Sequence, residues 1–268
     1  MYEYIDIHSH LYFPDFDEDR EEVIAQMKEE KIATISIGTD FVSSKKTIEL
    51  ANQHENLFAC IGQHPSELTI DSVFDARYSE LSENKNVVAI GECGLDYFRL
   101  APMNSSLKGI QKTIFQYQID MALFVDKPLM LHIRSAKGTL DAYEEALEIL
   151  EHHSKISGDK LRGNAHFFAG DIEILKRFLA IGFTVSFPGA ITFADSYDEL
   201  IQYAPINMIM AETDSPFVAP APHRGERNSP LFVPLVVERI AQVRGESLEE
   251  VKKALRDNAL LQFPAIAS

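Results

Sequence analysis

The stretch Tyr4-Ile-Asp6-Ile-His8-Ser-His10 joins a short apolar run to three side chains that can bind metal ions or move protons. Its isoleucines and tyrosine favour a short buried strand over residues 4–8. Residues two apart on a strand point to the same side, so Asp6 and His8 are expected to face the interior together, with His10 just past the strand end. A single histidine here is readily structural, but an apolar core does not hold all three without a reason. The stretch therefore predicts a strand whose carboxyl end carries chemistry.

Seven similar runs follow along the chain. Apolar or β-branched segments recur at residues 33–38, 57–62, 87–91, 129–132, 163–166, 184–187 and 208–211. Segments with helical spacing of apolar residues lie among them at 18–30, 111–125, 140–150, 171–180 and 248–261, with Asp171 as a candidate N-cap. This alternation predicts an α/β fold, most economically a (β/α)8 TIM-type barrel with parallel strands. A doubly wound open sheet is the alternative.

Length and composition set further expectations. A chain of 268 residues fits one hydrolase barrel domain over residues 1–268. No apolar run is long enough to span a membrane, and the first residues lack the basic and apolar regions of a signal peptide. Two cysteines, Cys60 and Cys93, are too few for a disulfide framework or a thiolate metal site. We therefore expect a cytoplasmic monomer with no membrane contact and no obligate protein partner.

The charge balance is acidic. Lys and Arg number 25 against 41 Asp and Glu, which gives a net charge of -16. Broad binding to nucleic acid normally needs a basic face, so tight nucleic-acid binding is not expected. The balance still permits an enzyme that reaches a few phosphates through metal ions and local arginines. We expect substrate affinity to depend on metal more than on salt.

Polar side chains follow most of the predicted strands at the same position. Six of the eight strands end on a histidine, a glutamate or an aspartate, and the five after the first strand carry His64, Glu92, His132 with Arg134, His166, and Asp214 within Glu212-Thr213-Asp214. In a parallel barrel all carboxyl ends of strands lie on one face, where such barrels place their active sites. Random placement would scatter these residues over strands and helices. The pattern therefore predicts one polar cluster.

Imidazoles and carboxylates gathered in this way are ligands for Zn²⁺, Mn²⁺, Fe²⁺ or Mg²⁺. The residues are too many for one tetrahedral ion, and a pair of ions about 3.5–4 Å apart, bridged by a carboxylate, fits better. Such a pair lowers the pKa of a bound water toward neutrality. A metal-free cluster is the alternative, and it would carry a heavy desolvation cost unless every group were paired.

The order of the motifs resembles that of the TatD-related DNases, a family of metal-dependent hydrolases with amidohydrolase-like barrels. The matching segments are Asp6-Ile-His8-Ser-His10, Gly62-Gln-His64-Pro65, Gly91-Glu92-Cys-Gly94-Leu95-Asp96-Tyr97, His132-Ile-Arg134, Glu212-Thr213-Asp214-Ser-Pro216 and Arg224-Gly225-Glu-Arg227-Asn228-Ser-Pro230. Each motif alone is weak, but six in order from residue 6 to about 230 are specific. The chain departs from the family pattern at His166-Phe167-Phe168, where the family often has His-Cys-Phe.

The resemblance implies a set of metal ligands at the matching positions. It implies His8, His10 and Asp214 as ligands of a first metal, His132 and His166 as ligands of a second, and Glu92 as the bridge between them. Asp214 is also implied to act as the acid and base for the attacking water. Glu92 shares in catalysis through its bridging position.

Three further residues are expected to support the ligands or the substrate. Asp6 is expected to orient a ligating histidine, because metal-bound imidazoles usually donate their other N–H to an acceptor. Glu212 is expected to hold the loop or to help at the metals. His64 is expected either to contact a substrate phosphate or to support the metal ligands.

Arginines near the motifs are candidates for phosphate binding, since the guanidinium fork matches phosphate oxygens. Arg134 follows the fifth strand directly, and Arg224 and Arg227 lie in the irregular loop 215–230. An irregular segment of this length is more often functional than idle. The alternative for the two loop arginines is that they hold the loop by hydrogen bonds.

These observations favour a hydrolase that cleaves phosphodiester bonds of DNA, exonucleolytically on single strands or ends. It would use two divalent ions (Mg²⁺, Mn²⁺ or Zn²⁺) and a metal-activated water, with DNA as a transient substrate. The same site could hydrolyse another ester or an amide, such as an aminoacyl-tRNA ester, because a fold does not fix a function. A non-catalytic binding protein is the third hypothesis, and the complete ligand set argues against it.

Overall fold

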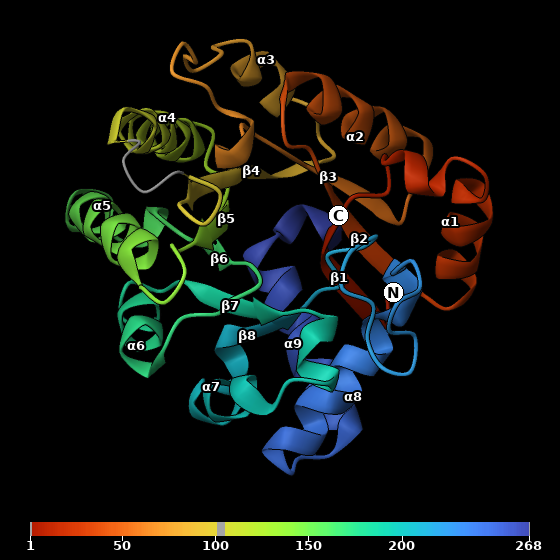
Figure 1. Cartoon of the computed structure of the whole chain (residues 1–268). Helices are drawn as coiled ribbons and strands as arrows, with labels where there is room; N and C mark the ends of the chain where they lie inside the picture. Colours follow the sequence, from red (N-terminus) through yellow and green to blue (C-terminus); the bar gives the residue numbers. More distant parts are fainter. Residues whose placement is uncertain (1, 101–104, 268) are drawn as a thin grey trace.

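The computed structural model describes residues 2–100 and 105–267, and its strands form one sheet that curves into a barrel (Figure 1). The strands are Tyr4–Ser9 (β1), Ile32–Ile37 (β2), Leu57–Ile61 (β3), Val87–Asp96 (β4), Leu129–Arg134 (β5), Gly163–Ala165 (β6), Thr184–Phe187 (β7) and Ile209–Ala211 (β8). They pair in parallel in chain order, and a bridge between Ser9 and Ser215 joins β1 to the segment after β8. The sheet is nearly closed, which confirms the (β/α)8 barrel over the open sheet.

The helices other than the last form a ring around the strands, in chain order, when the barrel is viewed along its axis (Figure 1). The helices are Arg20–Glu29 (α1), Phe41–Gln53 (α2), Tyr78–Ser82 (α3), Ser105–Phe124 (α4), Asp141–Ser157 (α5), Ile172–Ala180 (α6), Asp198–Tyr203 (α7), Val233–Arg244 (α8) and Leu248–Gln262 (α9). Short 3-10 helices lie at Pro14–Phe16 (η1), Pro65–Glu67 (η2), Gly158–Lys160 (η3), Gly189–Thr192 (η4), Asp195–Tyr197 (η5), Ile206–Met208 (η6), Pro230–Phe232 (η7) and Pro264–Ala267 (η8). Across the described residues, none of the helices combines the length and apolar character needed to cross a bilayer.

Helix starts follow from local side-chain caps. The carboxylate of Asp171 accepts a hydrogen bond from the backbone N–H of Ile174, which confirms the N-cap predicted for α6. Asp40 and Ser43 form a reciprocal capping box at the start of α2. The apolar pattern alone did not predict α2, because its first turns read Ser-Ser-Lys-Lys and its buried residues are mostly small or polar.

Strand β4 is longer than the sequence predicts. It continues through Asp96, so Glu92 lies within the strand, and its register with β5 shifts between Gly91 and Cys93. Gly94 has φ +139°, and a Cβ there would collide with the carbonyl oxygen of His132 on β5. This close approach of the two strands sets Glu92 and Asp96 beside the His132 ring.

Apolar residues fill the opposite end of the barrel. Inward-facing side chains of β1 and β2, such as Ile5, Ile7 and Ile35, form one buried cluster with Phe263 and Ile266. Phe263 follows α9 and Ile266 lies in η8, and α9 passes behind the strands at the centre of the view (Figure 1). The segment 248–267 therefore seals the amino-terminal end of the barrel, and polar groups are left to the carboxyl end.

Candidate metal centre

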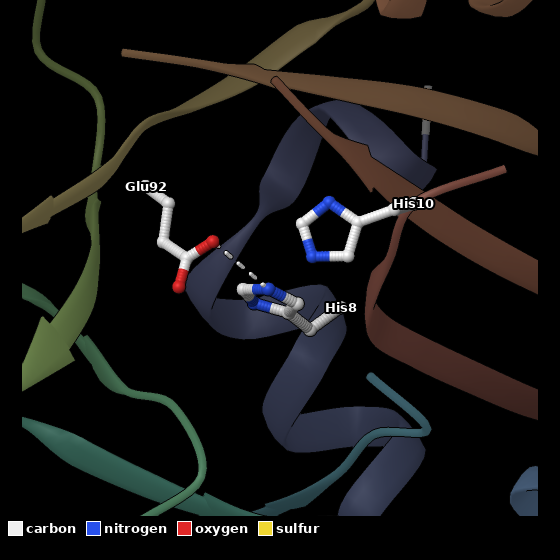
Figure 2. Close-up of side chains that lie close together, drawn as sticks. All are labelled: His8, His10 and Glu92. Atoms are coloured by element: carbon white, nitrogen blue, oxygen red, sulfur yellow. Dashed lines mark ion pairs between the residues drawn. The ribbon is translucent and has the colours of Figure 1, made fainter. Parts of the chain in front are cut away.

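Glu92 lies at the centre of a group of histidines at the carboxyl end of the barrel. Its Oε1 is 2.8 Å from Nδ1 of His132 and 2.9 Å from Nε2 of His166. Its Oε2 is 3.4 Å from Nε2 of His8, across the barrel (Figure 2). One carboxylate thus reaches rings that come from β1, β5 and the end of β6, as a bridging ligand would.

Asp214 forms the second carboxylate of the group. Its Oδ1 lies 3.5 Å from Nε2 of His10 and 3.8 Å from Nε2 of His8. Its backbone N–H donates to the carbonyl oxygen of His8 at 2.8 Å, and its φ is +56°. Figure 2 shows that the ring of His10 lies beside that of His8, facing Glu92. The structure therefore brings all the predicted ligands together.

The rings of His10 and His132 are each held through the nitrogen that faces away from the cluster. Nδ1 of His10 lies 3.0 Å from the carbonyl oxygen of Ile37, so this nitrogen carries a proton, and Nε2 is left toward Asp214. Nε2 of His132 lies 3.1 Å from Oδ2 of Asp96, which leaves Nδ1 toward Glu92. Acceptors that fix the outer ring nitrogen in this way are typical of metal sites.

His166 lies against Glu212, but among the described residues its Nδ1 makes no hydrogen bond, unlike the outer nitrogens of the other two rings. Nδ1 of His166 lies 3.3 Å from Oε1 of Glu212, and Nε2 faces Glu92. Glu212 is fully buried, and it accepts hydrogen bonds from the Ser186 hydroxyl at 2.6 Å and the Phe167 N–H at 2.8 Å. The structure thus places Glu212 where it supports a candidate ligand.

His8 supplies the clearest test of whether a cation fits. The residue is fully buried, and among the described residues neither of its ring nitrogens has a hydrogen-bond partner. A buried unpaired imidazole is costly, and a cation bound by Nε2 beside Glu92 and Asp214 would satisfy it. The surrounding donors are imidazole nitrogens and carboxylate oxygens, which suit Zn²⁺, Mn²⁺ or Mg²⁺. The residues present therefore fit a metal centre.

A cavity of about 600 Å³ opens above these side chains. Its wall includes the two carboxylates, together with Phe13, Phe167 and Phe217. A space of this size is typical of small-molecule and cofactor sites. The candidate ligands thus lie at the bottom of a pocket that a substrate can enter.

Comparison with known proteins identifies the family. The family model described as TatD related DNase matches residues 5–264. The chain belongs to this family. YabD of Bacillus subtilis (strain 168) is 35% identical over 263 residues, which cover 96% of this chain and 98% of the relative. YcfH of Escherichia coli (strain K12) is 30% identical over 98% of this chain and 97% of its own length. Both relatives are described as uncharacterized metal-dependent hydrolases, so the chain is a member of a metal-dependent hydrolase family.

Solved structures share the fold. YjjV, a TatD homologue from Escherichia coli K12, superposes with a TM-score of 0.84 over 98% of both chains at 24% identity. A TatD family hydrolase from Entamoeba histolytica gives a TM-score of 0.79 over 98% of both chains at 20% identity. These similarities confirm the TatD barrel predicted from the sequence.

The electrostatics of the TatD-family site depend on the balance between its carboxylates and its rings. Burial raises the carboxyl pKa of Glu92, but the neighbouring rings, His64 first, outweigh it and hold that pKa well below its ordinary value. The pKa of Asp214 is also lowered, because contact with a histidine ring outweighs its burial. Burial lowers the pKa of His8, and repulsion from His166 lowers it further. The carboxylates are thus charged and available to a cation.

Asp6 supports the TatD-family site differently from the sequence prediction. Its carboxylate accepts hydrogen bonds from the backbone N–H groups of His8 at 3.2 Å and Thr213 at 2.9 Å, and from the Thr213 hydroxyl at 2.7 Å. Among the described residues this carboxylate contacts no ring nitrogen, so it holds the candidate ligand His8 through the backbone and not through the ring as expected. Asp6 instead ties the backbone of β1 to the segment that carries Asp214. Burial raises its pKa to about 7.

His64 is oriented as a hydrogen-bond donor. Its Nδ1 accepts from the backbone N–H of Ser66 at 3.0 Å, so the proton of the neutral ring is on Nε2. That Nε2 lies 3.4 Å from Oε1 of Glu92. His64 is therefore placed to donate to Glu92 or to a substrate oxygen, and it also lies with Glu92 and His132 in a group whose ligand atoms are close enough to hold an ion.

The three arginines predicted to bind phosphate occupy different environments. Arg134 lines the cavity, with its guanidinium 3.9 Å from the centre of the Phe98 ring. Arg227 donates to both carboxylate oxygens of Asp19, at 2.7 and 2.6 Å, and does not line the cavity. Arg224 lies over the Phe193 ring and is also outside the cavity lining. The structure therefore supports the alternative hypothesis for Arg227, that it holds the loop 215–230 by hydrogen bonds.

Two residues at the site were not assigned a role from the sequence. Asp96 contacts His132 and also accepts from the backbone N–H of Phe98 at 3.0 Å. Its signal was the spacing Glu92-x-Gly94-x-Asp96, since residues at even spacing on one strand face the same side. Arg99 lines the cavity as well. No sequence pattern distinguishes it, because it follows the strand by three residues in an irregular segment.

Proposed function

We propose that this TatD-family protein hydrolyses phosphodiester bonds of DNA, from the ends of single strands, with two divalent ions drawn from Mg²⁺, Mn²⁺ and Zn²⁺. The observation that carries the proposal is a pair of arginines on the wall of the metal pocket, Arg99 and Arg134, which have no acidic partner within residues 2–100 and 105–267. Guanidinium groups left free beside a metal centre favour an anionic substrate, and the phosphodiester provides that anion.

The free arginines stand out in a chain whose net charge is -16. Elsewhere guanidinium groups are paired with carboxylates, at Arg20, Arg77, Arg162, Arg177, Arg227, Arg239, Arg244 and Arg256. Among the described residues, Arg99, Arg134 and Arg224 make no ion pair. Arg99 and Arg224 lie in the segments that follow β4 and β8, and Arg134 is the last residue of β5, so all three are on the side of the barrel that holds the candidate ligands. Positive charge is therefore left available at the mouth of the pocket.

The residues of the chain divide the work of hydrolysis by position. Ions held by the histidines and Glu92 would activate a water and polarise a phosphoryl oxygen. Asp214, on the cavity wall, is placed to take the proton of the attacking water. His64, whose Nε2 carries a proton, donates to a phosphate oxygen, and Arg134 neutralises a second one.

The shape of the pocket favours a strand end over the middle of a duplex. A cavity of about 600 Å³ is of the size that holds one drug-sized ligand, such as a terminal nucleotide, and the acidic chain offers no broad basic face for a duplex. We further propose that the protein acts in the cytoplasm as a monomer, with DNA as a transient substrate.

The test is cleavage of single-stranded DNA labelled in parallel at the 5′ and the 3′ end. The protein is first stripped with a chelator and then reconstituted with Mg²⁺, Mn²⁺ or Zn²⁺. We expect progressive shortening that needs metal and is absent from the double variant Glu92→Ala/Asp214→Ala, and the two labels identify the end attacked. Bound metal, measured by mass spectrometry, is expected at two ions per chain and at fewer in the variant.

Other results would change the assignment. Protein that holds metal but cleaves no DNA would contradict the nuclease proposal and move it to another ester or amide, such as an aminoacyl-tRNA ester. A single ion per chain in active protein would contradict the two-ion centre while leaving hydrolysis in place.

A further inference from the structure

We propose that the base of the terminal nucleotide stacks on the Phe217 ring, with its edge against the perpendicular Phe13 ring, while its phosphodiester lies over the metal centre. The inference rests on the proposed function and deepens it, because it assigns a part of the pocket to the base. We call these two residues the ring platform.

The ring platform lies directly beside a candidate metal ligand. The Phe13 ring is stacked against His10, with centroids 5.0 Å apart and an interplanar angle of 29°. The Phe217 ring lies 5.7 Å from Phe13 and 6.0 Å from His10, edge-on to both. Both phenylalanines line the cavity, and Phe217 is 48% exposed. A base on these rings would therefore sit next to the reacting phosphate.

Hydrogen bonds fix the backbone under both rings. The N–H of Phe217 donates to the carbonyl oxygen of Asp214 at 2.9 Å, and its own carbonyl accepts from the Asn228 side chain at 2.6 Å. The N–H of Phe13 donates to the carbonyl of His10 at 3.0 Å. The backbone of each phenylalanine is thus tied to its surroundings beside a predicted ligand, so both rings start from fixed positions next to the candidate metal centre.

Other exposed rings near the mouth are already covered by cations. Arg134 lies 3.9 Å from the centre of Phe98, and Arg224 lies 4.0 Å from the centre of Phe193. In the described part of the chain, no cation lies over Phe13 or Phe217. The pocket therefore has one cationic wall and one bare aromatic wall.

A nucleotide has the complementary arrangement, with an anionic end and a flat base. Stacking of a base on an aromatic side chain contributes about 1–3 kcal/mol and tolerates any base, because every base has a π-face. An amide or ester substrate without an aromatic group would make no use of an exposed phenylalanine beside the metal ligands. The ring platform thus favours a nucleotide and predicts weak preference among bases.

The absence of tryptophan from the sequence allows a direct test by fluorescence. Phe217→Trp introduces the single tryptophan of the chain on the ring platform. Tyr203→Trp is the matched control, because Tyr203 is 47% exposed and lies outside the cavity lining. The probes are deoxyadenosine 5′-monophosphate and 2-deoxyribose 5-phosphate, which share the phosphate and sugar and differ in the base.

We expect deoxyadenosine monophosphate to quench Phe217→Trp in a saturable manner, while deoxyribose phosphate at the same concentration does not. The control is expected to respond to neither. Equal responses of Phe217→Trp to the two probes, or no response to either, would overturn the ring platform.

Kinetics provide a second readout. Phe217→Ala is expected to raise KM for an oligonucleotide by about 5- to 150-fold, which corresponds to the loss of one stacked base. With an abasic residue at the terminal position, KM of wild type and variant should coincide, and Phe217→Tyr should restore the wild-type KM. A KM increase of the same size on both substrates would contradict stacking.

Failure of the two proposals can be told apart. Base-dependent quenching in protein that cleaves no DNA supports the ring platform and rejects the nuclease. DNA cleavage without base-dependent quenching supports the nuclease and rejects the ring platform.

Discussion

At the amino-terminal end of the barrel, Phe263 and Ile266 pack against isoleucines of β1 and β2, whereas at the carboxyl end charged carboxylates lie among histidine rings. Both ends are buried, with Phe263 at 0% and Glu92 at 3% exposure. Burial of an apolar ring stabilises the fold, but burial of ionisable groups costs free energy unless they are paired or bind a cation. The two ends therefore contribute differently. The amino-terminal end stabilises the barrel, whereas the carboxyl end lowers its stability and carries the groups for catalysis.

Substitution of Glu92, the central carboxylate of the site, should have the largest effect on activity with the least effect on the fold. Glu92→Gln keeps the side-chain volume but removes the charge that faces the rings of His8, His132 and His166. We expect hydrolysis to fall by about 10³-fold or more, since metal ions supply several kcal/mol of charge stabilisation in the transition state. Turnover and thermal melting followed by circular dichroism check the prediction. An unfolded variant would show that the carboxyl end also maintains the fold.

The converse change is Phe263→Ala at the sealed end. The side chain is fully buried, so we expect the free energy of unfolding to fall by about 3–5 kcal/mol, while the folded protein still binds metal. Urea denaturation and metal analysis provide the measurements. Leu261→Ala is the matched control, because Leu261 is 83% exposed nearby and should change stability by less than about 0.5 kcal/mol. Loss of metal from folded Phe263→Ala protein would contradict the prediction, because it would show that the amino-terminal end also maintains the metal centre.

Arg134 sharpens the comparison within the carboxyl end. Its guanidinium makes no ion pair in the described part of the chain, so its removal should lower the free energy of unfolding by at most about 1 kcal/mol, the contribution of its exposed contact with the Phe98 ring. We expect Arg134→Ala to raise KM for DNA by about 10- to 100-fold, as a lost hydrogen bond to a charged group would. Steady-state kinetics and a melting curve measure the two effects. A lower melting temperature with an unchanged KM would assign Arg134 to the fold.

Arg227 should show the opposite pattern and the smallest effect. The pair with Asp19 is about one third exposed, so Arg227→Ala is expected to lower the free energy of unfolding by about 0.5–1 kcal/mol, with KM unchanged. The hydrogen bond to Arg227 lowers the pKa of Asp19. This stabilisation is therefore present above the ordinary aspartate pKa of about 4 and is lost as pH falls through the lower folded value. Urea titrations at pH 7 and pH 3 measure the difference, and an equal deficit at both values would contradict it.

The strands could be predicted from the sequence because their signal is local. Runs of β-branched and apolar residues mark seven of them to within one or two residues. Strand β4 is the exception, since Glu-Cys-Gly-Leu-Asp at residues 92–96 lacks an apolar pattern. Those residues are in a strand because β5 supplies their pairing partners, and such pairing cannot be inferred from the segment alone.

The candidate ligands were also predictable, since each matches a family motif and all except Glu92, which lies within β4, are near or just past the end of a strand. The surroundings of the arginines were not. Asp19 lies 208 positions before Arg227, and only the folded chain shows that they meet. The same limit applies to Asp6, whose role at the backbone of Thr213 depends on the register shift in β1. Sequence thus indicates which side chains carry chemistry more readily than which of them are already engaged.

The seal formed by residues 248–267 has a consequence for synthesis on the ribosome. Every strand emerges before this segment, so Ile5, Ile7 and Ile35 have no cover while the rest of the barrel is being made. Exposed apolar surface in partly folded chains promotes aggregation. We therefore expect the nascent barrel to need protection from aggregation, as chaperones provide, until α9 and η8 have left the exit tunnel.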